Sequence, residues 1–307
     1  MKPSFAGSVR YTEMLPATQS SPALEFEVHE WAPAEPCAHL LLVHALSGGG
    51  HDFAELAHRL VEHGIRCVAP DMPGHGVSPP LPQGIAVQAA MSRCLFHLAC
   101  HQPKGPVVYL GTSWGGHAIL PILRSGLVRV DGAIFNDIML ERSNTLNVLP
   151  SRLEAKAARR AASFDEVIAM ILDEAEGHHY QRDLLHVPRE RLDAWARRRF
   201  VEGPDGWREQ FDAATVKALG EPPDPEAPAY TPGRHVARLT CPVLMIEGRY
   251  SPISGTRTLK TLLSLRPNLT SLMLEGGHAP KLMTDDQIGA VKAWLLTTLE
   301  AGRRGSS

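Results

Sequence analysis

The sequence lacks the features that mark membrane proteins and nucleic-acid-binding proteins. No apolar run in it approaches the roughly 20 residues that a helix needs to cross a bilayer, and residues 1–7 carry no apolar stretch of a signal peptide. The formal net charge of -2 provides no basic excess that would attract a polyanion. We therefore expect a cytoplasmic protein that acts on a small molecule, with neither a membrane span nor a nucleic acid partner.

The sequence also lacks the cysteine spacing of a metal site or a disulfide framework. Its five cysteines form no C-x-x-C pair, and Cys67 and Cys241 lie in or beside apolar runs. Such positions favour buried thiols over disulfides or metal ligands. We expect no metal, and no sequence motif indicates a cofactor.

Apolar runs alternate with segments of helical periodicity along most of the chain. With 44% hydrophobic and 21% charged residues among 307, the chain can bury one large core. Several runs are almost continuously apolar, as is typical of parallel strands covered by helices on both faces. The sequence therefore predicts an α/β protein with a mostly parallel, doubly wound sheet. The predicted strands are 24–31, 38–43, 65–70, 106–112, 131–136, 241–247 and 269–275.

Residues 138–235 interrupt this alternation. They are rich in Arg, Glu and Ala, contain no convincing strand, and end in a Pro-rich stretch, 221–228, that predicts an extended linker. Apolar residues at helical spacing predict several short helices. We expect a helical cap at 138–235, inserted between the two parts of one core at 1–137 and 236–307. The residues that carry this prediction are Phe164, Val167, Ile168, Ile171, Leu172, Leu192, Trp195, Phe200, Trp207 and Phe211.

The segment 111–116, Gly-Thr-Ser-Trp-Gly-Gly, is the strongest functional signal. It follows the apolar run 107–110 and precedes a segment of helical periodicity, so it reads as strand, sharp turn and helix. In a nucleophile elbow the small flanking residues allow a strained turn that exposes the serine hydroxyl. We therefore predict that Ser113 is a nucleophile, and that Pro121 bends or shortens the helix that follows.

Two glycine-rich loops supply candidate partners for this serine. Residues His44–Gly50 follow an apolar run and form a loop of small residues, as an oxyanion hole of backbone N–H groups requires. Near the C-terminus, His278 lies in a second glycine-rich loop after the last predicted strand. An imidazole in that position could reach the serine, so His278 is the predicted general base.

Together with the turn Asp71–Ser78, these segments resemble the α/β-hydrolase superfamily over almost the whole chain. The turn, Asp-Met-Pro-Gly-His-Gly-Val-Ser, is similar to the family's D-x-P-G-x-G-x-S, and the oxyanion loop, turn, elbow and late histidine occur in the family's order. The resemblance implies the α/β-hydrolase fold with an inserted cap. It also implies a catalytic acid after the strand that follows the cap, in a pattern close to G-x-x-D.

The sequence departs from the family at that acid, because the matching residues 248–251 end in Ser251. A serine hydroxyl carries no charge to stabilise an imidazolium. Some relatives supply the carboxylate from the end of the strand after the elbow, which here is Asp137. Bracing of the cap by an Asn-Asp pair accounts equally well for that residue. Glu141 and Glu247 are weaker candidates, and a dyad without an acid is the remaining alternative.

The predicted chemistry is acyl transfer to water, with an oxyanion hole formed by the backbone N–H groups of Leu46 and Trp114. Ala45 stands where relatives usually have glycine, which leaves open whether its N–H or that of Leu46 points inward. We expect a carboxylesterase-like hydrolase of small to medium apolar esters. The alternatives are a C–C bond or lactone hydrolase, for which an acidic substrate would predict a basic residue in the pocket, and a non-catalytic ligand-binding receptor.

Other polar residues are expected to be structural. His44, His51 and His75 fit loop-bracing roles. His178 and His179 would point about 100° apart on a helix, which does not suit a shared ligand. The run Arg197-Arg198-Arg199 is expected to form a solvated face.

Overall fold

The computed structural model describes residues 8–19, 21–82, 85–141, 149–177, 181–220, 231–253 and 257–304. An eight-stranded sheet runs through it in the order β1-β2-β4-β3-β5-β6-β9-β10. The strands from β4 to β10 in this order are parallel, and β1 and β2 add an antiparallel edge. The predicted α/β fold with a mostly parallel sheet is therefore confirmed. The strands are β1 (Val9–Leu15), β2 (Leu24–Trp31), β3 (Ala38–Val43), β4 (Ile65–Pro70), β5 (Val107–Thr112), β6 (Gly132–Asn136), β9 (Val243–Gly248) and β10 (Leu269–Leu274).

All seven predicted strands are present, with ends that differ by no more than two residues. The sequence did not predict β1, whose residues are mostly exposed or half-buried. This strand needs no apolar run because it lies at the edge of the sheet and pairs only with β2.

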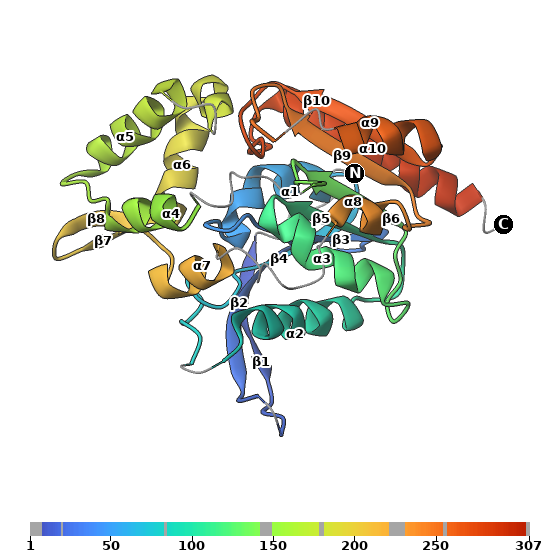
Figure 1. The fold of residues 1–307 in the computed structure, drawn as a ribbon, viewed down its shortest axis with the longest axis horizontal. Coiled ribbons are helices and arrows are strands. Elements are labelled where there is room, and N and C mark those ends of the chain that lie inside the picture. The colour runs from blue at the N-terminus through green and yellow to red at the C-terminus, as the bar shows by residue number, and fades with distance from the viewer. Residues whose placement is uncertain are drawn as a thin grey trace.

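Helices cover both faces of the sheet (Figure 1). In β3, Leu40 and Leu42 pack on the side of α1 and α10, whereas Leu41 and Val43 pack on the side of α2 and α3. Burial on both faces explains why the strand sequence is almost continuously apolar. The core helices are η1 (Gly50–Phe53), α1 (Ala54–Val61), α2 (Val87–Cys100), α3 (Trp114–Arg124), α8 (Pro232–Val236), α9 (Arg257–Leu265) and α10 (Asp285–Arg304).

A mostly helical segment, residues 149–220, lies between β6 and β9 in the chain and beside the sheet in Figure 1. Its apolar residues, among them Ile168, Leu192 and Trp195, form a cluster that Met283 of the core joins. We call it the helical segment. Its elements are α4 (Leu149–Ala158), α5 (Phe164–Gly177), η3 (Arg182–His186), α6 (Arg189–Arg199), β7 (Phe200–Gly203), β8 (Gly206–Glu209) and α7 (Ala213–Gly220).

Some local predictions are wrong. Phe200 and Trp207 lie in the hairpin of β7 and β8 and not in helices, because Gly206, at φ 96°, allows a tight turn between two short strands. Phe211 also lies outside the helices, since it forms an isolated bridge with His75 before α7 begins. The helix α3 continues past Pro121 to Arg124, and the bend or shortening expected from this proline stays a prediction. The predicted linker 221–228 and the pair His178 and His179 lie outside the described residues.

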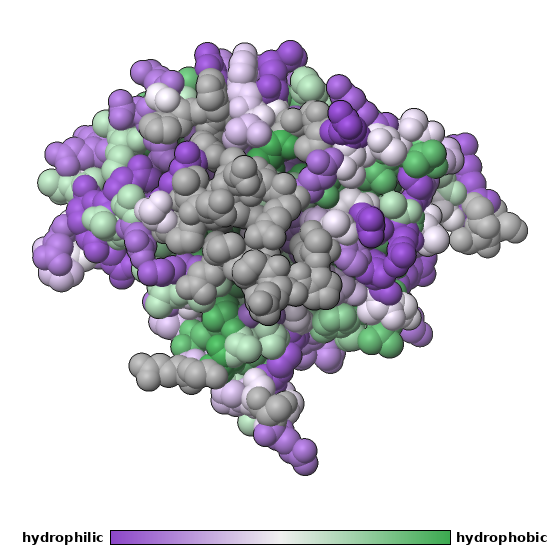
Figure 2. Space-filling model, viewed as in Figure 1, coloured by the Kyte–Doolittle hydropathy of each residue, from purple (hydrophilic) through white to green (hydrophobic). Residues whose placement is uncertain are grey.

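Further features of the fold are the hydropathy of the surface, the length of the helices and the state of the cysteines. In Figure 2, hydrophilic residues make up much of the coloured surface, and hydrophobic residues form a patch below the centre and smaller patches elsewhere. Among the described helices, none is both long and apolar enough to cross a membrane. All five cysteines are free thiols, of which Cys67, Cys94 and Cys241 are buried, whereas Cys37 and Cys100 are exposed.

Candidate active site

Ser113 occupies a strained turn between β5 and α3. Its backbone has φ 51° and ψ -115°, a region that residues with a side chain rarely adopt. Two bonds hold the turn: the Ser113 N–H donates to the Asn136 carbonyl (2.9 Å), and the Gly116 N–H donates to the Ser113 carbonyl (3.0 Å). Strain of this kind costs on the order of 1–3 kcal/mol and is concentrated at functional sites.

A chain of two hydrogen bonds joins Ser113, His278 and Asp137. The Ser113 Oγ lies 2.8 Å from His278 Nε2, and His278 Nδ1 lies 3.0 Å from Asp137 Oδ2. Because an ionised carboxylate only accepts hydrogen bonds, Asp137 keeps the imidazole proton on Nδ1. The lone pair of Nε2 then faces the serine hydroxyl, which is the arrangement a general base needs.

The parallel sheet explains how these distant residues meet. Ser113, Asp137 and His278 follow the carboxyl ends of β5, β6 and β10, which lie at the same edge of the sheet. The Asp137 N–H extends the ladder by donating to the Ile246 carbonyl (2.8 Å). Asp137 and Ala279 also have positive φ, 55° and 56°, so strained backbone gathers around the three side chains.

The Asp137 carboxylate contacts the loop of His278, which differs from the bracing of the cap that the sequence offered as an alternative. It is 2% exposed, and its Oδ2 accepts both the His278 ring N–H and the Ala279 backbone N–H (2.7 Å). The carboxylate therefore orients the imidazole and also braces the loop that carries it.

The other candidates for the acid have different surroundings. The Oγ of Ser251 accepts the Ile253 N–H (3.3 Å), and its N–H donates to the Gly248 carbonyl (2.9 Å), so it closes a turn after β9. Glu141 is exposed and accepts the Thr258 N–H (2.9 Å) in the first turn of α9. Glu247 lies in β9, where its register partner is Met273 of β10.

The residues 44–49, which we call the oxyanion loop, lie directly against the elbow. A Cβ atom on Gly115 would lie 2.3 Å from the Val43 carbonyl oxygen and 2.6 Å from that of His44, so only glycine permits this approach. Trp114 begins α3, where backbone N–H groups have no partner within the helix. Within the described residues, the Leu46 N–H donates no hydrogen bond. Both predicted oxyanion donors therefore belong to segments that are in contact at the elbow.

Buried histidines brace this loop, as the sequence suggested. The Met72 N–H donates to His44 Nε2 (3.1 Å), which leaves the proton on Nδ1 to donate to the Ala45 carbonyl (2.7 Å). Burial lowers the pKa of His44 to about 3, so the ring stays neutral and keeps this tautomer. His75 Nε2 lies 2.8 Å from the Leu46 carbonyl oxygen. Both rings pack near Trp114, with centroids 6.4 and 6.5 Å from it.

The prediction that residues 197–199 form a solvated face is wrong for one of the three arginines. Arg197 and Arg198 are exposed, but Arg199 is 5% exposed. Its guanidinium donates to both carboxylate oxygens of Asp52 (3.1 Å each) and to the Ser47 carbonyl (2.7 Å). Arg199 is buried because the end of α6 lies against the core, where Asp52 neutralises its charge. The spacing of the three arginines in the sequence does not show this contact, so it could not distinguish Arg199 from its neighbours.

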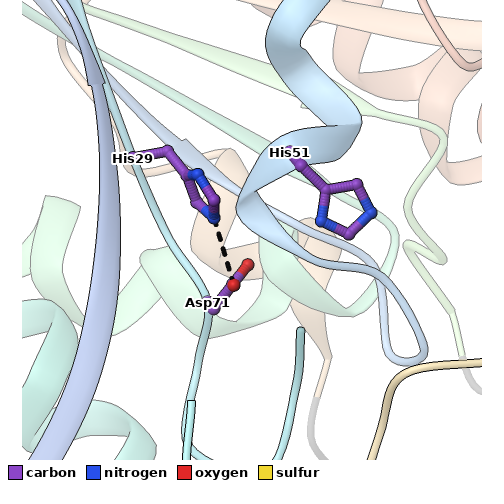
Figure 3. Close-up of side chains that lie close together, drawn as sticks. All are labelled: His29, His51 and Asp71. Atoms are coloured by element: carbon purple, nitrogen blue, oxygen red, sulfur yellow. Dashed lines mark hydrogen bonds and ion pairs between the residues drawn. The ribbon is translucent and has the colours of Figure 1, made fainter. Parts of the chain in front are cut away.

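A cluster that the sequence did not indicate is formed by His29, His51 and Asp71 (Figure 3). One potential ligand atom from each lies within 4.8 Å of the others, whereas ligand atoms around a tetrahedral zinc are separated by about 3.3 Å. Asp71 already accepts hydrogen bonds from His29 Nε2 (3.1 Å) and from the Gly50 and Val77 N–H groups (2.6 and 3.0 Å). These bonds join β2, η1 and the turn after β4 through Asp71. The His51 ring makes none of them, and its Nε2 lies 3.6 Å from Asp52 Oδ1.

Comparisons with known proteins agree with this architecture. The model of the alpha/beta hydrolase family matches residues 40–291. A curated relative named "Putative non-heme haloperoxidase", from Mycobacterium phage D29, is 28% identical over 146 residues, which are 48% of this chain and 52% of the relative. That match therefore spans about half the length of the relative.

Solved structures show the same fold at low sequence identity. An alpha/beta hydrolase from Novosphingobium aromaticivorans is 22% identical, with a TM-score of 0.71 over 95% of this chain and 98% of the other. A thermophilic esterase from Thermogutta terrifontis is 19% identical, with a TM-score of 0.64 over 94% and 99% of the two chains. At these identities the likeness concerns the fold.

Proposed function

Because this chain belongs to the alpha/beta hydrolase family, we propose that it is a serine hydrolase that cleaves carboxylic esters through an acyl-enzyme. The observation that carries the proposal is the hydrogen-bonded chain from Ser113 through His278 to Asp137. The strained backbone of Ser113 supports it, because an ordinary surface serine has no need of a positive φ.

In the proposed first step, His278 Nε2 takes the Ser113 hydroxyl proton as Oγ attacks the ester carbonyl carbon. The carbonyl oxygen becomes an oxyanion that accepts hydrogen bonds from the N–H groups of Leu46 and Trp114. The buried Asp137 stabilises the imidazolium that forms. The tetrahedral intermediate then collapses, and the alcohol leaves with the proton from Nε2.

Water hydrolyses the acyl-enzyme by the same route in reverse. His278 takes a proton from water, the hydroxyl attacks the acyl carbon, and Ser113 leaves with the proton as the acid is released. The helical segment acts in this proposal as a cap over the elbow. Leu153 of α4 and Val216 of α7 support that role, because they form an apolar cluster with Leu46 of the oxyanion loop, against which Trp114 packs.

The decisive experiment is hydrolysis of p-nitrophenyl esters with short and medium acyl chains by the wild type and by Ser113→Ala. We expect turnover in the wild type and its loss in the variant, with Ser251→Ala as a control that changes another serine. Labelling with a fluorophosphonate, followed by intact mass, tests the nucleophile without the natural substrate. A wild type that neither hydrolyses these esters nor forms the adduct would refute the proposal.

A further inference from the structure

A buried charge network joins the helical segment to the oxyanion loop. It contains two cations, Arg199 of α6 and Lys156 of α4, and two anions, Asp52 of η1 and Glu209 of β8, whose side chains are between 6% and 14% exposed. Arg199 Nε also contacts Glu209 (3.4 Å), and Lys156 Nζ lies 3.3 Å from Glu209. The two positive and two negative charges therefore compensate each other in a buried region, where solvent would screen them little.

This network holds the oxyanion loop at three points. The Arg199 guanidinium donates to the Ser47 carbonyl (2.7 Å), and the Lys156 ammonium donates to the Ser47 hydroxyl (3.0 Å). The Asp52 carboxylate, paired with Arg199, accepts the Gly49 N–H (3.2 Å). Residues outside the loop thus hold the carbonyl and the hydroxyl of Ser47 and the N–H of Gly49. Ser47 directly follows the proposed donor Leu46.

Asp52 and Arg199 also hold each other in place. The Trp195 ring N–H donates to Asp52 Oδ1 (2.8 Å). Burial works to raise the pKa of Asp52, but Arg199 and His51 outweigh it and hold the pKa well below its usual range. Asp52 is therefore ionised at neutral pH and can fix the guanidinium through two charge-assisted hydrogen bonds.

The part of the helical segment that carries Arg199 is itself anchored on the core. Arg191, two turns earlier on α6, donates to the Met283 carbonyl (3.1 Å) and contacts Glu55 of α1 (3.5 Å). A second attachment joins the Gly76 N–H to the Gln210 carbonyl (3.0 Å), directly after β8. Arg199 therefore acts on the oxyanion loop from a fixed support.

We infer that Arg199 is a positioning residue for the oxyanion hole, through which the helical segment sets the direction of the Leu46 N–H. This inference rests on the proposed function. The Ser47 carbonyl belongs to the peptide between Ser47 and Gly48, two peptide units after the one that carries the Leu46 N–H. Releasing it frees rotation about the backbone bonds of Leu46 and Ser47, which lie between the carbonyl and the donor. Arg199 needs no contact with substrate for this role.

The test is steady-state hydrolysis of a p-nitrophenyl ester by Arg199→Lys and by the double variant Asp52→Asn/Arg199→Met. Lysine keeps a charge for Asp52, but its donors share one nitrogen, whereas the guanidinium reaches Asp52 and the Ser47 carbonyl from two separate nitrogens. The double variant leaves no buried charge without its partner. Complete loss of one oxyanion donor costs about 10²–10³ in turnover, so a loosened donor should lower kcat by roughly tenfold in Arg199→Lys and more in the double variant. KM should change little.

A boronic acid inhibitor distinguishes positioning from simple stability. Its boron bonds to Ser113 Oγ, and the resulting tetrahedral boronate anion places one of its oxygens in the oxyanion hole, so its dissociation constant should rise by the factor by which kcat falls. Ser47→Ala, which loses the contact of the hydroxyl with Lys156 but keeps the carbonyl that Arg199 holds, should fold and show a smaller loss in the same direction. Arg189→Ala, which removes an exposed pair with Asp193 on the same helix, is the matched control and should match the wild type.

The outcomes separate the two proposals. Folded Arg199→Lys and Ser47→Ala proteins with wild-type kcat and inhibitor affinity would overturn the positioning role. So would equal losses in the Arg189→Ala control. Absence of Ser113-dependent hydrolysis in the wild type would instead overturn the proposed function.

Discussion

Replacing Asp137 with asparagine should abolish most of the proposed hydrolysis while leaving the fold intact. The backbone of Asp137 has φ 55°, which asparagine tolerates better than alanine does, so Asp137→Asn avoids added strain. The variant keeps the size of the side chain and changes its charge and its hydrogen-bonding pattern.

The expected loss follows from the two donors that share Oδ2, the His278 ring N–H and the Ala279 N–H. If the amide oxygen takes this place, both bonds survive but the charge that stabilises the imidazolium is gone. If the amide NH₂ takes it, the imidazole must accept at Nδ1 and carry its proton on Nε2, where it cannot accept the Ser113 proton. The corresponding change in a serine protease lowers kcat by about 10⁴, and we expect a loss of about 10³–10⁴ here.

The assay compares kcat for a p-nitrophenyl ester in the wild type, Asp137→Asn and Glu141→Gln, with circular dichroism to verify folding. Glu141→Gln is the control, since it changes an exposed carboxylate four residues away that contacts Thr258. A folded Asp137→Asn protein with kcat within tenfold of the wild type would show that Asp137 only braces the loop. The reasoning from tautomer and charge would then be refuted.

Three further predictions concern the surroundings of the site. Ser251→Ala should change kcat less than about threefold, because among the described residues its hydroxyl makes one bond, to the Ile253 N–H; a loss as large as that of Asp137→Asn would give Ser251 a role in the chemistry. Gly111→Ala should lower the free energy of unfolding by about 1–3 kcal/mol or more, because its Cβ would lie 2.5 Å from the Gly116 backbone. Gly289→Ala, in α10 with no atom within 4 Å of the added Cβ, should raise it by about 0.5–1 kcal/mol, and denaturant unfolding of both variants checks the contrast. Burial raises the pKa of Asp183 above its unfolded value near 3.8, so this group lowers stability as pH rises from that value through its folded pKa. Asp183→Asn should therefore gain thermal stability over the wild type between pH 4 and pH 8, and a difference in Tm that does not grow with pH would contradict this.

The sequence predicts a structural feature correctly where the physical cause of that feature lies within one short segment. The strands of the core need apolar residues on both faces, so their runs were readable and their ends were located within two residues. The elbow needs small residues around Ser113, and this requirement appears directly in the sequence. The charged, mostly exposed β1 carries no such signal, because its position at the sheet edge follows from pairing with β2.

Contacts between segments that are distant in the sequence could not be predicted from local patterns. Arg199 looks like its two exposed neighbours in sequence, and its burial depends on Asp52, 147 residues earlier. The cluster of His29, His51 and Asp71 likewise exists only because β2, η1 and the turn after β4 meet. Phe200 and Trp207 were assigned to helices because aromatic spacing does not distinguish a short hairpin from a helical turn.

The sequence by itself determined the parallel α/β core, the elbow with Ser113 and the loop with His278, since each depends on local periodicity or on small residues at a turn. It left several carboxylates as partners for the histidine. Tertiary structure decided between them, because parallel strands bring the ends of β6 and β10 to one edge and so place Asp137 3.0 Å from His278. It also decided the burial of Arg199 against the oxyanion loop, because that contact requires α6 to dock on η1 and no local pattern encodes the docking.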